Sequence, residues 1–198
     1  MRKSEIATKI EDSIKETAKQ FDIKKNRAFY FRNESDIQCR LFTCISQNIN
    51  DPELVHAEQR IENSGSWHDL VVWKPEMKVI AVTHWDKYTG EFANLLPDIN
   101  LAVIETKHLY GGIKKAQEYL SYKSICSHID IQNLINRVNN DCKYAYFVMF
   151  WDEDVDSNTE FTNCYNKMQK TFIAFRKKHK RIRVLCKTRD GLQFNLGF

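Results

Sequence analysis

The chain has no long hydrophobic run and no cysteine spacing of the kind that binds a structural metal. Its longest uninterrupted apolar stretch, Ala145–Trp151, is far shorter than the roughly 20 residues that cross a bilayer, and no apolar signal-peptide block stands near the N-terminus. The six cysteines are scattered, without a C-x-x-C pair or a compact Cys/His cluster. These absences predict a cytoplasmic protein with reduced cysteines and no membrane contact.

The chain also lacks an internal tract that looks like a linker between two domains. Its 198 residues are 42% hydrophobic and 12% aromatic, which is enough to bury one substantial core. We therefore expect a single domain over residues 1–198. Its expected parts are an accessory helix and strand in residues 1–30, a core in residues 31–151, and a helix and strand in residues 152–198.

Charge of one sign is not in large excess, because the net charge is only +4. The basic residues are nevertheless uneven, and six of them fall within eight positions near the C-terminus: Arg176, Lys177, Lys178, Lys180, Arg181 and Arg183. Such a cluster can neutralise several phosphates. Lysine and arginine also favour the negative pole at a helix C-terminus, and both interpretations can hold together. We predict phosphate contacts for Arg181 and Arg183.

Apolar residues at helical spacing predict five helices. The first begins near Ser4 as an amphipathic accessory helix, and its apolar side carries Ile6, Ile10, Ile14 and Ala18. The second is capped by Asn33 or Ser35 and ends before Pro52. The other three are expected over residues 113–124, over residues 129–138, and from Asp156 or Ser157 to about residue 178.

Strand patterns lie between these helices. The predicted strands cover residues 55–61, 67–73, 78–85, 101–107, 143–151 and 183–187. Two of them, beginning at Leu101 and Lys143, are apolar on both faces, which is typical of central strands covered above and below. This order of elements predicts an α/β sandwich with a mixed sheet.

The strand at residues 101–107 ends in the candidate chemistry, Glu105-Thr106-Lys107. Residues two apart on a strand project from one face, about 6.6 to 6.8 Å apart, so Glu105 and Lys107 can share a site. Mg²⁺ prefers carboxylate, water and phosphate oxygens, and a nearby ammonium can stabilise charge on a phosphate or orient a water. A carboxylate in such a strand is costly to bury unless it meets a cation or strong donors. The alternative is a structural salt bridge between Glu105 and Lys107.

Here the sequence resembles the PD-(D/E)XK nuclease superfamily, which includes restriction endonucleases and Holliday-junction resolvases. The matching residues are Glu34 near the start of a helix, Asp69 in the strand 67–72, Glu105-Thr106-Lys107, and the following helix that contains Gln117. The resemblance covers roughly residues 30–151. It implies a restriction-endonuclease-like three-layer core, with a central mixed sheet flanked by helices, plus the N-terminal accessory helix.

The resemblance also implies an activity, Mg²⁺- or Mn²⁺-dependent cleavage of phosphodiester bonds in DNA. Asp69 and Glu105 would be the metal ligands, Lys107 the cation that acts on the transition state or positions the water, and Glu34 an additional acid. Lys114 and Gln117 on the following helix are candidates for phosphate contacts, although solvation explains them equally well. A homodimer is plausible because a duplex has two strands to cut.

Several alternatives stay open at this point. Asp98 is the rival of Asp69, but only six residues separate it from Glu105, which scarcely leaves room for a hairpin. Glu58 can replace Glu34 as the accessory acid. Three histidines, His68, His84 and His108, flank the site without metal-ligand spacing. The alternative function is a non-catalytic module that binds nucleic acid or protein on the same fold.

Overall fold

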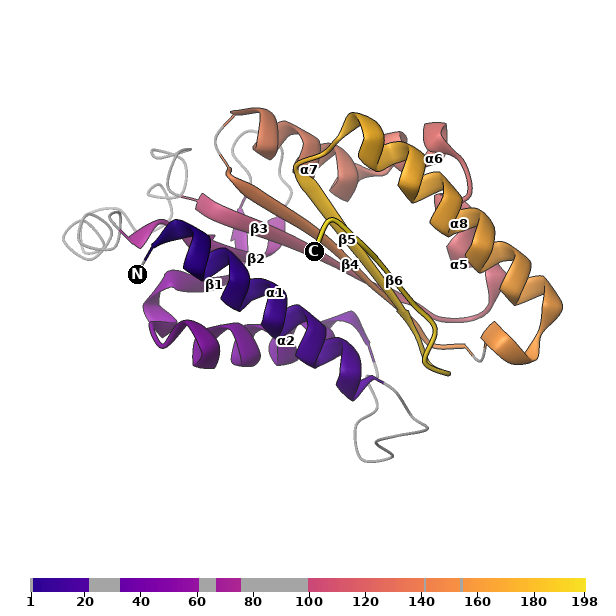
Figure 1. Ribbon diagram of the computed structural model, residues 1–198, viewed down its shortest axis with the longest axis horizontal. Helices are drawn as coiled ribbons and strands as arrows, with labels where there is room; N and C mark the ends of the chain where they lie inside the picture. Colours follow the sequence, from indigo (N-terminus) through magenta and orange to yellow (C-terminus); the bar gives the residue numbers. More distant parts are fainter. Residues whose placement is uncertain (1, 22–32, 61–66, 76–99, 141, 154) are drawn as a thin grey trace.

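The structure is a computed structural model that describes residues 2–21, 33–60, 67–75, 100–140, 142–153 and 155–198. In these residues a six-stranded mixed sheet lies between two layers of helices, and the strands follow one another across the sheet in chain order (Figure 1). The predicted α/β class with a mixed sheet is confirmed. None of the helices in the described segments is long and apolar enough to cross a membrane.

The sheet is antiparallel at both sides and parallel in the middle. The strands are β1 (Val55–Arg60), β2 (Trp67–Trp73), β3 (Asn100–Leu109), β4 (Tyr144–Trp151), β5 (Ile182–Thr188) and β6 (Gln193–Leu196). β3 runs parallel to β4, and β4 runs parallel to β5, whereas the other neighbours are antiparallel. Nearly every residue of β3 and β4 is buried, as their unbroken apolar stretches predict.

Two helices, α1 (Lys3–Gln20) and α2 (Glu34–Ile49), form the layer on one face of the sheet (Figure 1). The apolar side predicted for α1 is fully buried. Its N-cap is Arg2 and not Ser4, which lies inside the first turn. Asn33 caps α2, because its side chain accepts a hydrogen bond from the Asp36 amide at 3.0 Å. This cap fixes where α2 begins and therefore the position of its first residue, Glu34.

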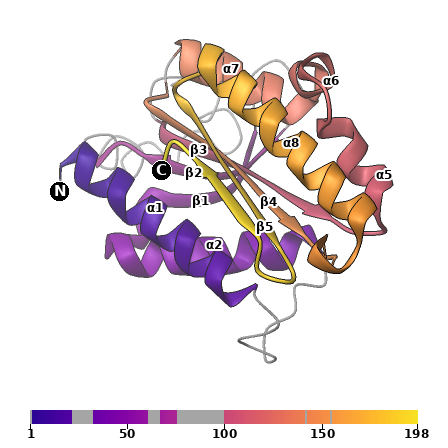
Figure 2. The same ribbon diagram turned by 45° about the vertical axis from the view of Figure 1, so that its right-hand side comes forward.

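The other layer contains α5 (Ile113–Ala116), α6 (Tyr122–Ser127), α7 (Ile129–Asn140) and α8 (Thr159–Lys178), which Figure 2 shows opposite α1 and α2. The single helix predicted over residues 113–124 is wrong. A 3₁₀ turn, Gln117–Tyr119, follows α5, and the Ser121 side chain accepts from the Ser124 amide and starts α6. Asn158, not Asp156 or Ser157, caps α8, after a 3₁₀ turn over Val155–Ser157.

The strand predictions need two further corrections. β6 was not predicted, because its four residues are too few to show a clear alternation. Ala57 is exposed, so β1 does not follow the inward and outward alternation that its sequence suggests. The predicted strand at residues 78–85 and the segment before Asn100 lie outside the described residues. A further 3₁₀ turn, Pro52–Leu54, leads into β1.

Aromatic packing between the sheet and α8 holds the segment after β3 in place. The ring of Phe172 on α8 lies 6.0 Å from that of Phe147 on β4 and 6.1 Å from that of Tyr119, measured between centroids. All three side chains are almost fully buried. The turn that carries Tyr119 is therefore anchored against the core, and its hydroxyl is directed to the site described below.

Candidate functional site

The candidate site lies along the side of β3 where its pairing with β2 stops. In the described residues the β2–β3 register ends at Leu70 opposite Ile104, although β3 runs on to Leu109. Beyond that point two carboxylates accept hydrogen bonds from β3 amides. Asp69 Oδ2 accepts from Thr106 N at 2.6 Å, and Glu34 Oε2 accepts from His108 N at 3.3 Å. Alternate amides face the same side of a strand, so both carboxylates lie along this side of β3.

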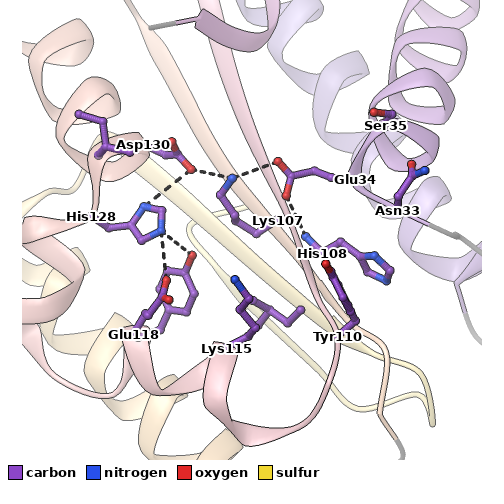
Figure 3. Close-up of a pocket in the computed structure, with 13 residues that line it drawn as sticks. Asn33, Glu34, Ser35, Lys107, His108, Tyr110, Lys115, Glu118, His128 and Asp130 are labelled. Carbon is purple, nitrogen blue, oxygen red and sulfur yellow. Dashed lines mark hydrogen bonds and ion pairs between the residues drawn. The ribbon is translucent and has the colours of Figure 1, made fainter.

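Lys107 lies between two carboxylates that come from opposite helical layers. Its Nζ is 3.0 Å from Glu34 Oε1 on α2 and 2.8 Å from Asp130 Oδ2 on α7 (Figure 3). Burial alone would lower the pKa of Lys107, but the ion pairs with Asp130 and Glu34 outweigh it and raise that pKa above its ordinary value. The ammonium is therefore charged and held in a defined place.

Asp69 is fixed through one carboxylate oxygen. Its Oδ2 accepts from both the amide and the hydroxyl of Thr106, at 2.6 and 2.8 Å. Burial, with a smaller contribution from repulsion by Glu34, raises the pKa of Asp69, although the Thr106 hydrogen bonds and Lys107 oppose the shift. Among the described residues these contacts leave Oδ1 available to a ligand.

Glu105 is the most deeply buried acid of the site, with a side chain 2% exposed. Its Oε1 contacts His68 Nδ1, and the Asp69 amide donates to its carboxylate. Burial first, and then repulsion by Asp69 and Asp130, raise the pKa of Glu105 well above its ordinary value, against the attraction of Lys107. A charge on Glu105 is therefore costly unless another cation joins the site.

Four carboxylates thus influence one another around a single ammonium: Glu34, Asp69, Glu105 and Asp130 around Lys107. No group of three His, Cys, Asp or Glu side chains in the described segments is arranged as a complete metal-binding set. Asp69 and Glu105 offer two carboxylates, and this fits a cation such as Mg²⁺, which takes most of its ligands from water and phosphate.

A pocket of about 610 Å³ opens beside Lys107. It is lined by residues from α2, the end of β3, and the segment from Lys115 to Asp130 (Figure 3). Within it His128 Nε2 lies 3.0 Å from the Tyr119 hydroxyl, and its Nδ1 lies 3.7 Å from Asp130. Asp69 and Glu105 do not line the pocket, but Lys107 does, and its charge lowers the pKa values of both acids.

The structure brings together the four residues predicted for catalysis, although not in the pairs that the sequence suggests. Lys107 pairs with Glu34 and Asp130, so the alternative salt bridge between Glu105 and Lys107 is not formed, and Glu105 contacts His68 instead. Asp98 and His84 lie outside the described residues, as does the side chain of Glu58.

The residues predicted to contact DNA are not among those that line this pocket. Lys114 and Gln117 are exposed and do not line it. Arg181 donates to the carbonyls of Val138 and Cys142 and so caps the end of α7. Arg183 forms an ion pair with Glu11 on α1 and lies over the ring of Tyr144, 5.3 Å from its centroid.

Sequence patterns missed Asp130 as a partner of Lys107. It stands in the first turn of α7, where an acid is expected simply because of the helix dipole. The order of helices and strands does not show that this turn meets the end of β3. Arg137, further along α7, was missed for the same reason, and it donates to the ring of His68.

The chain matches no protein-family model, no curated protein and no solved structure. The resemblance to the PD-(D/E)XK nucleases therefore stays a prediction from the sequence.

Proposed function

We propose that this protein is a Mg²⁺- or Mn²⁺-dependent nuclease that cleaves phosphodiester bonds in DNA on a restriction-endonuclease-like fold. The observation that supports this most is the set of four acids around Lys107 at the end of β3. The resemblance to the superfamily requires an accessory acid on a helix, an aspartate on a neighbouring strand and the Glu-x-Lys pair. In this chain these parts lie close together in space.

The donor set fits a divalent cation. A cation held by Asp69 and Glu105 would polarise the phosphate and lower the pKa of a bound water. The protein's own contribution is a pair of neighbouring carboxylates, a buried Glu105 and a half-buried Asp69, whose pKa values are raised mainly by burial and by repulsion from nearby acids. Such a pair binds a proton or a cation more readily than exposed acids do, because either one removes the cost of the buried charge.

Lys107 supplies fixed positive charge for the phosphate. Its ammonium is held by Glu34 and Asp130, so it does not have to be ordered when substrate arrives. Donors and charges that are in place before the reaction stabilise developing negative charge without a cost of reorganisation. The carboxylate of Glu34 also accepts a hydrogen bond from the His108 amide, and it holds Lys107 beside the pocket.

The proposal is tested by incubating the purified protein with supercoiled plasmid and with single-stranded DNA in Mg²⁺ or Mn²⁺. We expect metal-dependent cleavage that Glu105→Ala and Lys107→Ala each reduce by at least about a hundredfold. Cleavage that is absent from the wild-type protein, or unchanged in both variants, would contradict the proposal. A chelator control separates the metal-dependent reaction from contamination.

One observation favours a second candidate, a non-catalytic module that binds nucleic acid or protein. Glu105 is hydrogen bonded within the protein and does not line the pocket. A buried acid with a purely structural role would have both properties. Titration with Mn²⁺ separates the two functions. The nuclease should bind the ion in a way that requires Asp69 and Glu105, whereas the module should show no carboxylate-dependent binding.

The basic cluster makes a separate prediction. If Arg181 and Arg183 contact phosphates, the double variant Arg181→Gln/Arg183→Gln should depend less on salt when it binds DNA. The slope of the logarithm of the binding constant against the logarithm of the salt concentration should be smaller in magnitude by about 2. The affinity is measured by fluorescence anisotropy across a salt series, with thermal unfolding as the control, because both arginines also make contacts within the fold. An unchanged slope would assign them to structure alone.

A further inference from the structure

Behind Glu105 a chain of hydrogen-bonded polar side chains leads from β3 through the buried His68 on β2 to the half-buried Arg137 on α7. His68 Nδ1 contacts Glu105 Oε1, and on the other side of the ring Arg137 Nε donates to His68 Nε2 at 3.1 Å. The side chain of His68 is fully buried, and that of Glu105 is 2% exposed. The three residues come from three different elements and form one connected line.

The donors along this line follow from its chemistry. A guanidinium can only donate hydrogen bonds, so His68 Nε2 must be the acceptor from Arg137. A neutral imidazole then carries its hydrogen on Nδ1, which donates to Glu105. Burial, and then the positive charge of Arg137, lower the pKa of His68 to about 3, in agreement with a neutral ring. Arg137 thus fixes both the tautomer and the orientation of the ring.

The helix that supplies Arg137 also supplies Asp130, which pairs with Lys107. One helix therefore supports both members of the Glu-x-Lys pair, Glu105 through His68 and Lys107 directly. Partners of this kind, which hold a ligand from behind, orient the ligand and raise metal affinity.

We propose that His68 and Arg137 are positioning residues that hold the carboxylate of Glu105 in the orientation required to bind a divalent cation. This inference rests on the proposed function, since it assigns Glu105 to a metal. The competing explanation is a buried hydrogen bond that only joins β2 to β3. The two differ in a measurable way, because only a positioning role makes the cation affinity of the folded protein depend on His68.

The test compares Mn²⁺ binding, followed through the electron paramagnetic resonance signal of the free ion, in wild type and three variants. His68→Leu removes the donor to Glu105 and should weaken Mn²⁺ binding by about 10- to 100-fold. His68→Asn keeps an N–H near the Nδ1 position and should bind at least about tenfold more tightly than His68→Leu. Arg137→Met leaves the ring without its fixed tautomer and should weaken binding by about tenfold.

His179→Leu is the matched control, because it also removes a histidine that is hydrogen bonded to another side chain, Tyr122, away from the site. It should bind Mn²⁺ as the wild type does. Thermal unfolding without metal shows which variants are folded, and if His68→Leu is not, the comparison of Arg137→Met with wild type still decides the matter.

The inference is overturned if folded His68→Leu or Arg137→Met binds Mn²⁺ as tightly as wild type, or if His68→Asn is as weak as His68→Leu. A wild-type protein that binds no Mn²⁺ would be a different result, since it would defeat the nuclease proposal itself. DNA cleavage by wild type with normal Mn²⁺ affinity in His68→Leu would leave the nuclease standing and remove the positioning role.

Discussion

Replacing Lys107 with methionine should lower the rate of metal-dependent DNA cleavage by about a thousandfold. The ammonium pairs with two of the four acids of the site, Glu34 and Asp130, and its charge is held in place before substrate binds. Removing a fixed charge or donor that acts on a developing negative charge typically costs about 10²- to 10³-fold in rate. Single-turnover cleavage of a labelled duplex measures the effect on the chemical step.

The same substitution should destabilise the metal-free protein. Breaking a fully buried ion pair costs about 3 to 5 kcal/mol. The cost here should be smaller, about 1 to 2 kcal/mol, because the side chains of Lys107 and Glu34 are 22% and 34% exposed. Lys123→Met, an exposed lysine on α6, is the matched control and should change neither property. Cleavage by Lys107→Met within tenfold of wild type would contradict the role given to this residue.

The second large effect concerns Glu105→Gln, which should abolish detectable cleavage and yet stabilise the metal-free protein at neutral and alkaline pH. Gln keeps the shape and an acceptor for His68 but removes the charge that is buried beside Asp69. The pKa of Glu105 is raised well above the ordinary value of 4.5. Protonation of this carboxyl therefore favours the folded state.

The sign of the pH dependence follows from that raised pKa. The stability contributed by Glu105 is fully present below its unfolded pKa and is lost as the pH rises through the higher folded pKa. Glu105→Gln does not titrate, so its advantage in melting temperature should be small near pH 4.5 and should grow toward alkaline pH. Saturating Mn²⁺ should stabilise the wild type and not the variant.

Thermal unfolding across pH, with and without Mn²⁺, measures both effects. Glu16→Gln on α1 is the control, because Glu16 is an exposed acid whose pair with Lys19 contributes little. A Glu105→Gln variant that melts below wild type at pH 8, with a gap that does not depend on pH, would show that the charge of Glu105 is well compensated inside the protein. The site would then have no need of a cation.

The parts of the fold that could be predicted from sequence are those governed by local periodicity. The buried side of α1 repeats every three to four residues, and β3 and β4 are apolar on both faces, so their class and placement follow from the pattern. The prediction of one helix over residues 113–124 is wrong because the Ser121 side chain accepts a hydrogen bond from a backbone amide and starts a separate helix within this segment. Its apolar spacing alone does not reveal this break.

The candidate site shows the same division. Glu105 and Lys107 could be proposed from their spacing on one strand, and Glu34 and Asp69 from the resemblance to the PD-(D/E)XK superfamily. Their actual partners could not, since the contacts of His68 with Glu105 and with Arg137 join residues 37 and 69 positions apart. Such contacts depend on how helices pack on the sheet, which periodicity does not specify. Asp130 was missed for this reason.

The most direct test of the account is a crystal structure of the protein soaked in Mn²⁺, with the ion located by its anomalous scattering. The account predicts one ion bound by the carboxylates of Asp69 and Glu105, with Lys107 still beside it and His68 hydrogen bonded to Glu105. An ion bound elsewhere, or no ion at a concentration that supports DNA cleavage, would contradict the assignment of this site to metal-dependent chemistry.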